Sequence, residues 1–390
     1  MGFFFTFLFY YGIIIDIFEK GRIYHMKKRG LKKSVYTDRT LLYAVIIACV
    51  VGIVAIYSAT LSFETNTNVI IQSCGLLLGL VAVWVLNKID FEQYGYWSKY
   101  IYIACCALLV LVLIIGKSGD WGAQSWIRIG PIGIQPSEIA KIGFILTFSC
   151  HVAKEDGNIN KLPVIGKLIL HIAIPVFLIL LQPDAGSAMV FGFIFIVIMF
   201  AAGISYKYVA AAAGIGAVSL PLIYHFVLGE YQKHRIQVFF NPDLDKLGSG
   251  YNVIQSKIAV GSGEFYGKGF LNGTQNQLGI LPTKHTDFIF STIAEEWGFI
   301  GAIAVVLLLF FIIFRCIKAS KNTNSLYGKY ICLGVSAMLI FHTFENIGMC
   351  IGLMPVTGIP LPFISYGGTS LITNLIAIGI VLSITRKKFN

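Results

Sequence analysis

The sequence predicts an all-α polytopic membrane protein with about ten transmembrane helices, cytoplasmic N- and C-termini, and a long extracytoplasmic loop between helices 7 and 8. Of the 390 residues, 56% are hydrophobic and 13% are charged, whereas soluble domains contain about 25% charged residues. Apolar runs of about 18 residues or more can cross the hydrocarbon core as helices. Most Lys and Arg residues lie in every second connection between these runs, as expected for a chain that crosses a membrane repeatedly.

Ten apolar runs are candidate spans. They cover residues 41–59, 68–87, 100–116, 138–153, 167–183, 186–203, 208–228, 298–317, 330–353 and 369–385. We therefore expect a single membrane domain over 40–388, in which residues 229–297 form the long outer loop. A loop of that length is far longer than ordinary connections, which indicates a functional or partly ordered segment.

Residues 1–39 are expected to form an N-terminal cytoplasmic segment that is first apolar and then basic. Residues 1–25 contain Asp16 and lack the basic start and the small-residue cleavage site of a signal peptide. Three interpretations stay open: an interfacial helix, an eleventh span, or translated sequence upstream of a native start at Met26.

The orientation follows from Lys and Arg, which short cytoplasmic loops retain. Eight basic residues lie between positions 20 and 39, and three follow the last span at 386–388. In the resulting topology 21 of the 30 basic residues are cytoplasmic and eight are extracytoplasmic, while Lys141 lies within a span. The net charge of +11 is therefore mostly a topology signal, and we expect no nucleic-acid partner.

The eight cysteines mostly fall in or beside the apolar runs and form no CxxC pair. They are Cys49, Cys74, Cys105, Cys106, Cys150, Cys316, Cys332 and Cys350. We interpret them as small buried hydrophobic residues, not as disulfides or metal ligands.

The stretch "QPSEIAK" at 135–141 has the features of a helix start. Ser137 can cap the first amides, and Glu138 benefits from the helix dipole. Lys141 lies three residues later on the same face, so a structural Glu138–Lys141 pair is expected. The alternative is a site for a pyrophosphate, whose charge Lys141 and Arg128, which lies on the preceding loop, would neutralise.

The stretch "LPTKHTDFIFSTIAEEWGF" at 281–299 places charged residues just before a span. Thr292 and Glu295 fit a capping box, which explains Glu295 without a catalytic role. Asp287 has no such explanation. If 285–292 is helical, Asp287 shares a face with Ser291, and a carboxylate held between aromatic residues can serve as a general base.

Four weaker features complete the pattern. Asp184 is expected to cap the sixth span, and His342 and Glu345 to form a buried polar pair, with half a metal site as the less favoured interpretation. Residues 251–270 combine an amphipathic helix pattern with glycines that indicate tight turns. The proline- and glycine-rich segment 354–370 cannot continue a helix, so we expect it to line a cavity.

Four of these motifs resemble the SEDS family (shape, elongation, division and sporulation) of bacterial cell-wall glycan polymerases. The motifs are "GAQSWIRIG" with "QPSEIAK", "QPDAGSA", "NGTQNQLGILPTKHTDFIFSTIAEEWGF" and "GLMPVTGIPLPFISYGGTS". Within the family, "NGTQNQLGILPTKHTDFIFS" and the closing "GGTS" favour the elongation-type RodA subfamily over the division-type FtsW subfamily. The resemblance covers about 40–388.

The resemblance implies a peptidoglycan glycosyltransferase that polymerises lipid II at the outer face of the bacterial cytoplasmic membrane during elongation of rod-shaped cells. The family's essential aspartate corresponds to Asp287, which would act as general base or orient the attacking hydroxyl. Many members have Arg directly before the Trp of "SWIRIG", where this chain has Ser125, so Arg128 is the substitute.

The resemblance also implies the other substrate-binding residues. Arg128 and Lys141, with Lys284 as a further candidate, would face the pyrophosphate, and Glu138 would position Lys141. His285 would assist as a neighbouring partner or a phosphate contact, and Trp126 would stack on a sugar or mark the interface. No cofactor is certain and the metal site is unknown, although Mg²⁺ or Mn²⁺ stays open.

Besides lipid II and membrane lipid, the resemblance implies a class B penicillin-binding protein as partner, with contacts through the span 330–353 and the long outer loop. Two other functions stay open alongside division- or sporulation-type polymerisation. A lipid II flippase should show inverted repeats and midplane ionisable residues, whereas here the charges cluster at the outer face. A non-catalytic scaffold would make the outer carboxylate dispensable.

Overall fold

The computed structural model describes residues 38–61, 66–116, 125–129, 132–226, 229–245 and 248–386, and these residues belong to one unit, Thr37–Arg386. The interpretations of residues 1–25 and of Met26 lie outside this described part. The longer helices are α2 (Arg39–Thr60), α3 (Thr67–Leu86), α5 (Ser98–Ile115), α6 (Pro136–Lys154), α7 (Leu162–Leu180), α8 (Ala185–Ala201), α9 (Tyr206–Phe226), α13 (Ile289–Asn322), α14 (Leu326–Cys350) and α15 (Gly368–Thr385).

The connections contain shorter elements. These are α4 (Glu92–Tyr96), the strands β1 (Ile127–Ile129) and β2 (Ile132–Ile134), α10 (Glu230–Phe240), a 3-10 helix (Pro242–Asp245), α11 (Ser249–Ser262) and α12 (Thr274–Gln277). The two strands form an antiparallel hairpin in which Arg128 lies opposite Gly133. The long outer loop is therefore largely helical, and the helix expected within 251–270 is confirmed.

Each of the ten predicted spans falls on one of the long helices, which confirms the all-α membrane fold. Eight helices are long and apolar enough to cross a membrane within the described part of the chain, and α8, with 17 residues, is slightly shorter. The tenth, α6, is less apolar because Glu138 and Lys141 lie in its first two turns. The sidedness of the loops stays a prediction.

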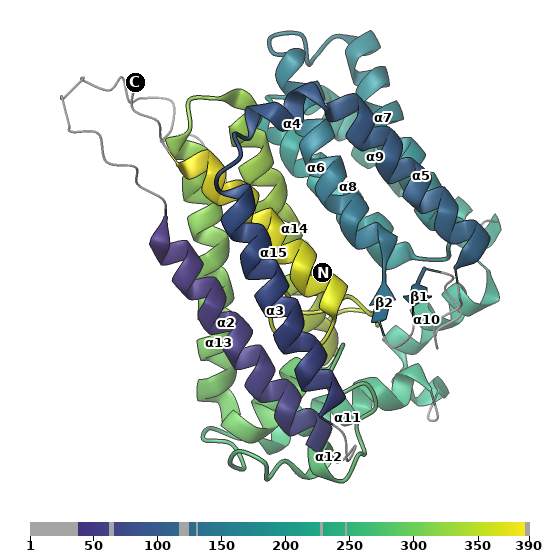
Figure 1. The fold of residues 1–390 in the computed structure, drawn as a ribbon. Coiled ribbons are helices and arrows are strands. Elements are labelled where there is room, and N and C mark those ends of the chain that lie inside the picture. The colour runs from purple at the N-terminus through teal and green to yellow at the C-terminus, as the bar shows by residue number, and fades with distance from the viewer. Residues whose placement is uncertain are drawn as a thin grey trace. The chain divides into compact units, whose positions relative to one another are not determined.

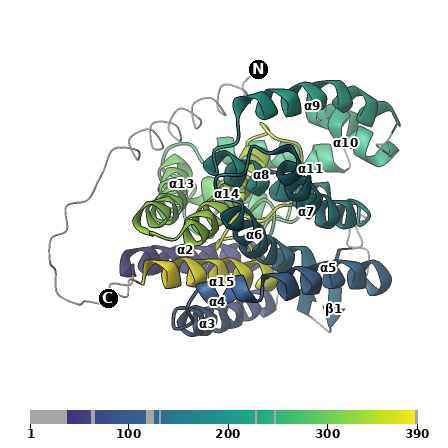
Figure 2. The same ribbon diagram turned by 90° about the horizontal axis from the view of Figure 1, so that it is seen from above.

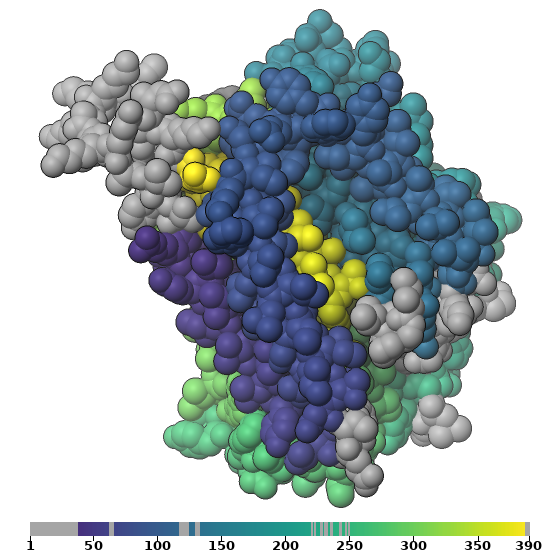
Figure 3. All heavy atoms as spheres, in the orientation of Figure 1, coloured from purple at the N-terminus to yellow at the C-terminus, as the bar shows by residue number. Residues whose placement is uncertain are grey.

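Helix α14 connects the parts of the bundle. It packs against α13 on one side and against α6 and α8 on another, while α2 packs along α13 and α3 along α15 (Figures 1 and 2). In the space-filling view only a narrow band of α15 reaches the surface beside α3 (Figure 3). Helix α14 is the most buried of the eight candidate spans, and Ile351 and Leu353, just after its end, are exposed. The partner surface expected on 330–353 stays a prediction.

All eight cysteines lie in described segments and have free thiols, and five of them are buried. These five agree with the interpretation as small buried hydrophobic residues, whereas Cys105 and Cys106 are half-buried and Cys74 is exposed. At α8, Asp184 accepts a hydrogen bond from the Ser187 amide at 2.9 Å, so the expected cap is confirmed. The cap expected from Ser137 is wrong, because α6 is preceded by Gln135 with no side-chain cap, and the Ser137 hydroxyl instead accepts a hydrogen bond from Ser187.

Helix α13 is broken at Gly298, where φ is 67°. The glycine-rich turn at 264–269 inserts its backbone into the break. The amides of Lys268 and Gly269 donate to the carbonyls of Glu295 and Glu296, both at 3.0 Å, and the Phe299 amide donates to the carbonyl of residue 264 at 2.9 Å. The turn thus satisfies backbone groups that the break leaves unpaired, as buried backbone groups require.

The capping box expected at Thr292 and Glu295 is wrong. Helix α13 begins three residues before Thr292, without a side-chain cap. The Glu295 carboxylate instead accepts hydrogen bonds from the Lys268 ammonium at 2.9 Å and from the amides of Gln275 and Asn276 at 2.9 and 3.1 Å. These distant donors satisfy the carboxylate better than one helix amide, so Glu295 attaches the outer loop to α13.

We predict that Gly298→Ala destabilises the protein by about 1–3 kcal/mol. Its φ lies in the left-handed region, and a Cβ at this position would approach the Gly267 amide nitrogen to 2.3 Å. Thermal melting in detergent measures the effect. Gly192→Ala is the matched control, since its Cβ would meet no atom within 4 Å, and a Gly298→Ala melting temperature equal to that of the control would contradict the prediction.

Candidate functional site

Asp287 lies in the turn that leads into α13. The amide of Thr286 donates to the carbonyl of Thr283 at 3.1 Å, and the amide of Phe288 donates to the same carbonyl at 3.4 Å. Because α13 begins only at Ile289, the expectation that 285–292 is helical and that Asp287 shares a face with Ser291 is wrong. The turn leaves the Asp287 side chain half-buried, whereas Phe288 is fully buried.

The backbone of Asp287 is held by α14. The Asn346 carboxamide donates to the carbonyl of Asp287 at 2.8 Å and to the carbonyl of Ile359 at 2.9 Å. Asn346 is completely buried, so these bonds are made away from competing water. One side chain therefore joins the Asp287 turn to the segment between α14 and α15.

That segment, residues 354–370, lies directly against the Asp287 turn. The Ser365 hydroxyl donates to the carbonyl of Thr286 at 2.7 Å, and the Tyr366 amide donates to the carbonyl of His285 at 3.0 Å. A Cβ on Gly358 would lie 3.7 Å from an oxygen of the Asp287 carboxylate. The non-helical backbone that the prolines and glycines predicted thus borders the candidate catalytic acid.

Gln72 of α3 fixes the far end of this segment. Its carboxamide donates to the carbonyl of Ser365 at 3.0 Å and accepts from the Gly367 amide at 3.1 Å. Neither Gln72 nor Asn346 was identified from the sequence. Each is a carboxamide within a predicted span, and that position is the signal that marks them, because polar residues inside a membrane usually have a specific partner.

Lys141 is completely buried near the start of α6. Its ammonium donates to the Glu138 carboxylate at 2.7 Å, which confirms the predicted pair, and it lies 3.0 Å from Nε2 of His342. Since an ammonium group has no lone pair, His342 accepts at Nε2. The expected His342–Glu345 pair is wrong: Glu345 accepts from the Thr357 hydroxyl at 2.9 Å.

The two halves of the candidate site meet along α14. His342, which contacts Lys141, and Asn346, which holds Asp287, are four residues apart. Four residues are about one turn and about 6 Å along a helix axis. Lys141 and the Asp287 turn, which are 146 positions apart in the sequence, are therefore anchored on neighbouring turns of one helix.

Lys284 is turned away from this arrangement. Its buried ammonium donates to the carbonyl of Asn276. Burial lowers its pKa, while the charges of Glu296 and Glu295 favour the protonated form. These contacts indicate that Lys284 stabilises the outer loop, and its role in substrate binding stays a prediction.

His285 is a neutral side chain near pH 7. Burial, and to a lesser extent the charge of Lys284, lower its pKa to about 4. Its ring lies beside that of Tyr366, with 5.5 Å between the centroids. His285 is therefore suited to a hydrogen bond with an uncharged group more than to an ion pair with a phosphate.

The hairpin before α6 carries Arg128 and Trp126. Arg128 is exposed, and the Trp126 ring lies over Gly133, where a Cβ would meet it at 2.9 Å. The Thr369 hydroxyl donates to the carbonyl of Gly133 at 2.7 Å, which attaches the hairpin to the start of α15 (Figure 1). Both predicted residues thus lie on a hairpin bonded to the same connection that contacts Asp287.

Within the described ranges no three or more His, Cys, Asp or Glu side chains lie together as a metal site. His342 and Glu345, the half site considered from the sequence, each bond to another residue.

The chain is similar to known proteins over most of its length. Residues 39–390 match a family model for FtsW, RodA and SpoVE, described as a cell cycle protein. The peptidoglycan glycosyltransferase MrdB of Escherichia coli (strain K12) is 35% identical over 92% of this chain and 95% of its own length. The peptidoglycan glycosyltransferase RodA of Treponema pallidum (strain Nichols) is 31% identical over 93% and 100%.

Two solved structures are also similar. The rod shape determining protein RodA of Thermus thermophilus has 28% identity and a TM-score of 0.69, with 91% of this chain and 99% of that chain covered. A chain from a study of how a peptidoglycan synthase complex coordinates polymerisation and crosslinking has 29% identity and a TM-score of 0.79, over 92% and 100%.

We predict that Lys141→Met strongly destabilises the protein, by about 3–5 kcal/mol, because it leaves the Glu138 carboxylate buried without a cation. The double variant Glu138→Gln/Lys141→Met should recover most of the loss, since no buried charge remains at this pair. Thermal melting of the single and double variants measures the coupling. Lys161→Met, at an exposed position, is the control, and a double variant as unstable as the sum of the singles would contradict the prediction.

We also predict that His285 makes the protein less stable in acid. The unfolded side chain binds a proton below about pH 6.5, whereas the folded one does so only below about pH 4. Stability should therefore fall as the pH drops from about 6.5 to about 4, by on the order of 1–3 kcal/mol. Melting curves of the native protein, His285→Gln and the exposed control His234→Gln test this. A fall that is equally steep in His285→Gln would refute it.

Proposed function

The chain belongs to the FtsW, RodA and SpoVE family, and on that premise we propose that it polymerises lipid II into β-1,4 glycan strands at the outer face of the cytoplasmic membrane during cell elongation. Relatives named peptidoglycan glycosyltransferase support the activity, and the names MrdB and RodA among them support the elongation role. The chain itself is a multi-pass membrane protein.

One observation carries the residue assignment: α14 bonds the Asp287 turn through Asn346 and contacts the Glu138–Lys141 pair through His342, one turn away. Glycosyl transfer from a pyrophosphate needs a carboxylate and a cation, and α14 holds the Asp287 turn and the helix that follows the Arg128 hairpin on neighbouring turns. The carboxylate removes a proton from the attacking hydroxyl, and the cation stabilises the negative charge of the leaving group.

In the proposed step, Asp287 is the general base. Its ionised carboxylate accepts the proton of the GlcNAc 4-hydroxyl on one lipid II molecule. The hydroxyl oxygen forms a bond to the anomeric carbon of MurNAc on a second molecule, while the bond between that carbon and the pyrophosphate oxygen breaks. Undecaprenyl pyrophosphate leaves with the bonding electrons, and attack from the opposite face converts the α linkage into a β linkage.

Arg128 is the cation we assign to direct contact with the pyrophosphate, because its side chain is exposed and its planar guanidinium suits phosphate oxygens. Lys141 is already paired with Glu138 and completely buried. We therefore propose that the Glu138–Lys141 pair does not contact the substrate but positions α6 and His342. We also propose that the Trp126 ring provides a surface for a sugar ring.

We propose a class B penicillin-binding protein as partner, which would cross-link the new strands. The similar chain from a peptidoglycan synthase complex supports this. Because α14 is largely buried, we place the contacts on the outer loop, where Phe265 and Tyr266 are exposed.

We predict that Asp287→Asn lowers the rate of glycan polymerisation at least 100-fold, because the amide keeps the shape of the side chain but cannot accept the proton as a base. The assay uses purified protein with its transpeptidase partner and lipid II in detergent, and chain products are separated by gel electrophoresis. Asp156→Asn, at an exposed position between α6 and α7, makes the same chemical change away from the site and should retain full activity.

Equal polymerisation by Asp287→Asn and the native protein would remove Asp287 from the mechanism. Absence of polymerisation from both, together with lipid II translocation in liposomes, would favour a flippase. Equal melting temperatures for the two proteins would show that any loss of activity is not a loss of folding.

A further inference from the structure

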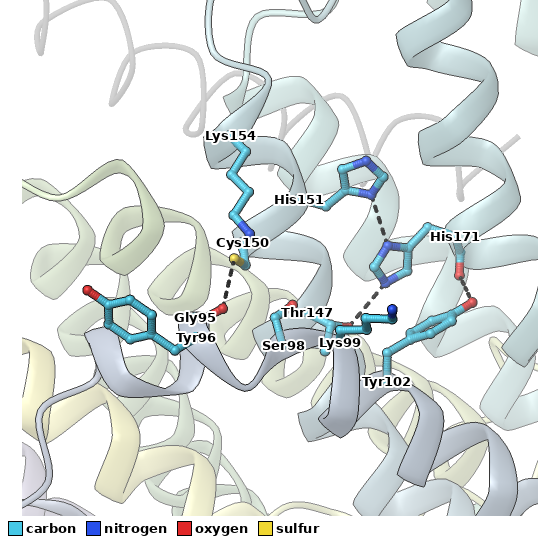
Figure 4. A pocket seen from close by; sticks show the side chains of 10 residues that line it. All are labelled: Gly95, Tyr96, Ser98, Lys99, Tyr102, Thr147, Cys150, His151, Lys154 and His171. Atoms are coloured by element: carbon cyan, nitrogen blue, oxygen red, sulfur yellow. Dashed lines mark hydrogen bonds between the residues drawn. The ribbon is translucent and has the colours of Figure 1, made fainter.

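A cavity with several polar side chains in its lining lies at the other end of α6, away from the candidate site. Its volume is about 260 Å³, and four helices line it: α4, α5, α6 and α7 (Figure 4). The lining residues are Gly95, Tyr96, Ser98, Lys99, Tyr102, Thr147, Cys150, His151, Lys154 and His171. Lys154 is 13 residues beyond Lys141, or about 20 Å along the helix, so this cavity is separate from the glycosyl-transfer residues.

A pair of histidines, His151 and His171, forms part of the cavity wall. Nδ1 of His151 and Nδ1 of His171 are 3.0 Å apart, and Nε2 of His171 lies 3.1 Å from the Thr147 hydroxyl (Figure 4). The Tyr102 hydroxyl donates to the carbonyl of His171 at 2.9 Å. Aromatic edges, including that of Phe148, enclose the His171 ring. A histidine in the middle of the apolar helix α7 is thus fixed in one orientation.

The contacts of the His151 and His171 rings involve three of their four nitrogens. The Nδ1–Nδ1 contact needs one proton between two nitrogens, and Thr147 occupies the second nitrogen of His171. His151 therefore keeps Nε2 for a further partner. A purely structural pair would account for His171, but it would not account for a cavity beside it that two lysines line.

The charge around the cavity is positive. Lys99 and Lys154 line it, both exposed, and none of its ten lining residues is acidic. Ammonium groups together with hydroxyl and imidazole donors are suited to the oxygens of a phosphate.

The surroundings of the cavity resemble a membrane interface. Tyr96, Trp97 and Tyr100 are exposed where α4 ends and α5 begins. Aromatic residues of this kind gather at the level of lipid headgroups. The basic residues of the chain predict that this end faces the cytoplasm. Basic pockets between transmembrane helices on that side bind anionic headgroups.

We infer that the cavity lined by Lys99, Lys154 and the His151–His171 pair is a binding site for a phosphate group, carried by an anionic lipid of the cytoplasmic leaflet. The site does not depend on the polymerase activity proposed above. Its occupant would bridge α5, α6 and α7 at the end of the helix whose opposite end carries Glu138 and Lys141.

The test measures binding of short-chain phosphatidylglycerol, short-chain phosphatidylcholine and inorganic phosphate to the purified full chain in detergent, by isothermal titration and by the shift in melting temperature. The variant Lys99→Gln/Lys154→Gln removes both cavity lysines. The matched control Lys161→Gln/Lys207→Gln removes two exposed lysines that do not line the cavity.

Phosphatidylglycerol should bind the native chain and the control within twofold of each other, and the cavity variant roughly tenfold more weakly. Inorganic phosphate that binds as tightly, with the same loss in the variant, would support the phosphate site and identify a soluble phosphate as its source. Equal binding by the native chain and the cavity variant would overturn the inference. Phosphatidylcholine binding as tightly as phosphatidylglycerol, or no binding of either anion, would also overturn it.

Discussion

Polar groups that enter the hydrocarbon layer must find their partners within the protein, because lipid offers none. Three features of the structure follow from this constraint. The backbone break at Gly298 is filled by the amides and carbonyls of the turn at 264–269. The non-helical segment 354–370 is bonded by carboxamides from two spans. The ammonium of Lys141 has both a carboxylate and an imidazole within 3.0 Å.

The same constraint explains why α14 is central to the candidate site. A buried helix that carries His342, Glu345 and Asn346 has to direct each of them to a partner on another element. These partners are the start of α6, the segment after α14, and the turn before α13. The hydrogen bonds that satisfy the buried polar groups of α14 therefore also assemble the proposed active site. Asp287 is held at a defined position because α14 is packed on several sides.

Much of the fold could be predicted from residues that interact locally. The ten spans follow from the length of the apolar runs, since each helix satisfies its own backbone bonds whatever lies beside it. The Glu138–Lys141 pair and the Asp184 cap were predicted correctly because their partners lie three residues away, within reach of a single helical turn. The prolines and glycines of 354–370 likewise exclude a helix at that position by their own geometry.

Predictions about polar residues failed where the partner was remote. Glu295 fits a capping box locally, yet it binds Lys268 and the start of α12, because a buried carboxylate is better satisfied by several donors than by one amide. His342 was expected to pair with Glu345, yet it contacts Lys141 of α6. The sequence by itself therefore identified a membrane protein of the FtsW, RodA and SpoVE family and selected Asp287 as the candidate catalytic residue. The packing of α14 determined which side chains surround that aspartate, because hydrogen bonds between distant segments form only after the helices have come together.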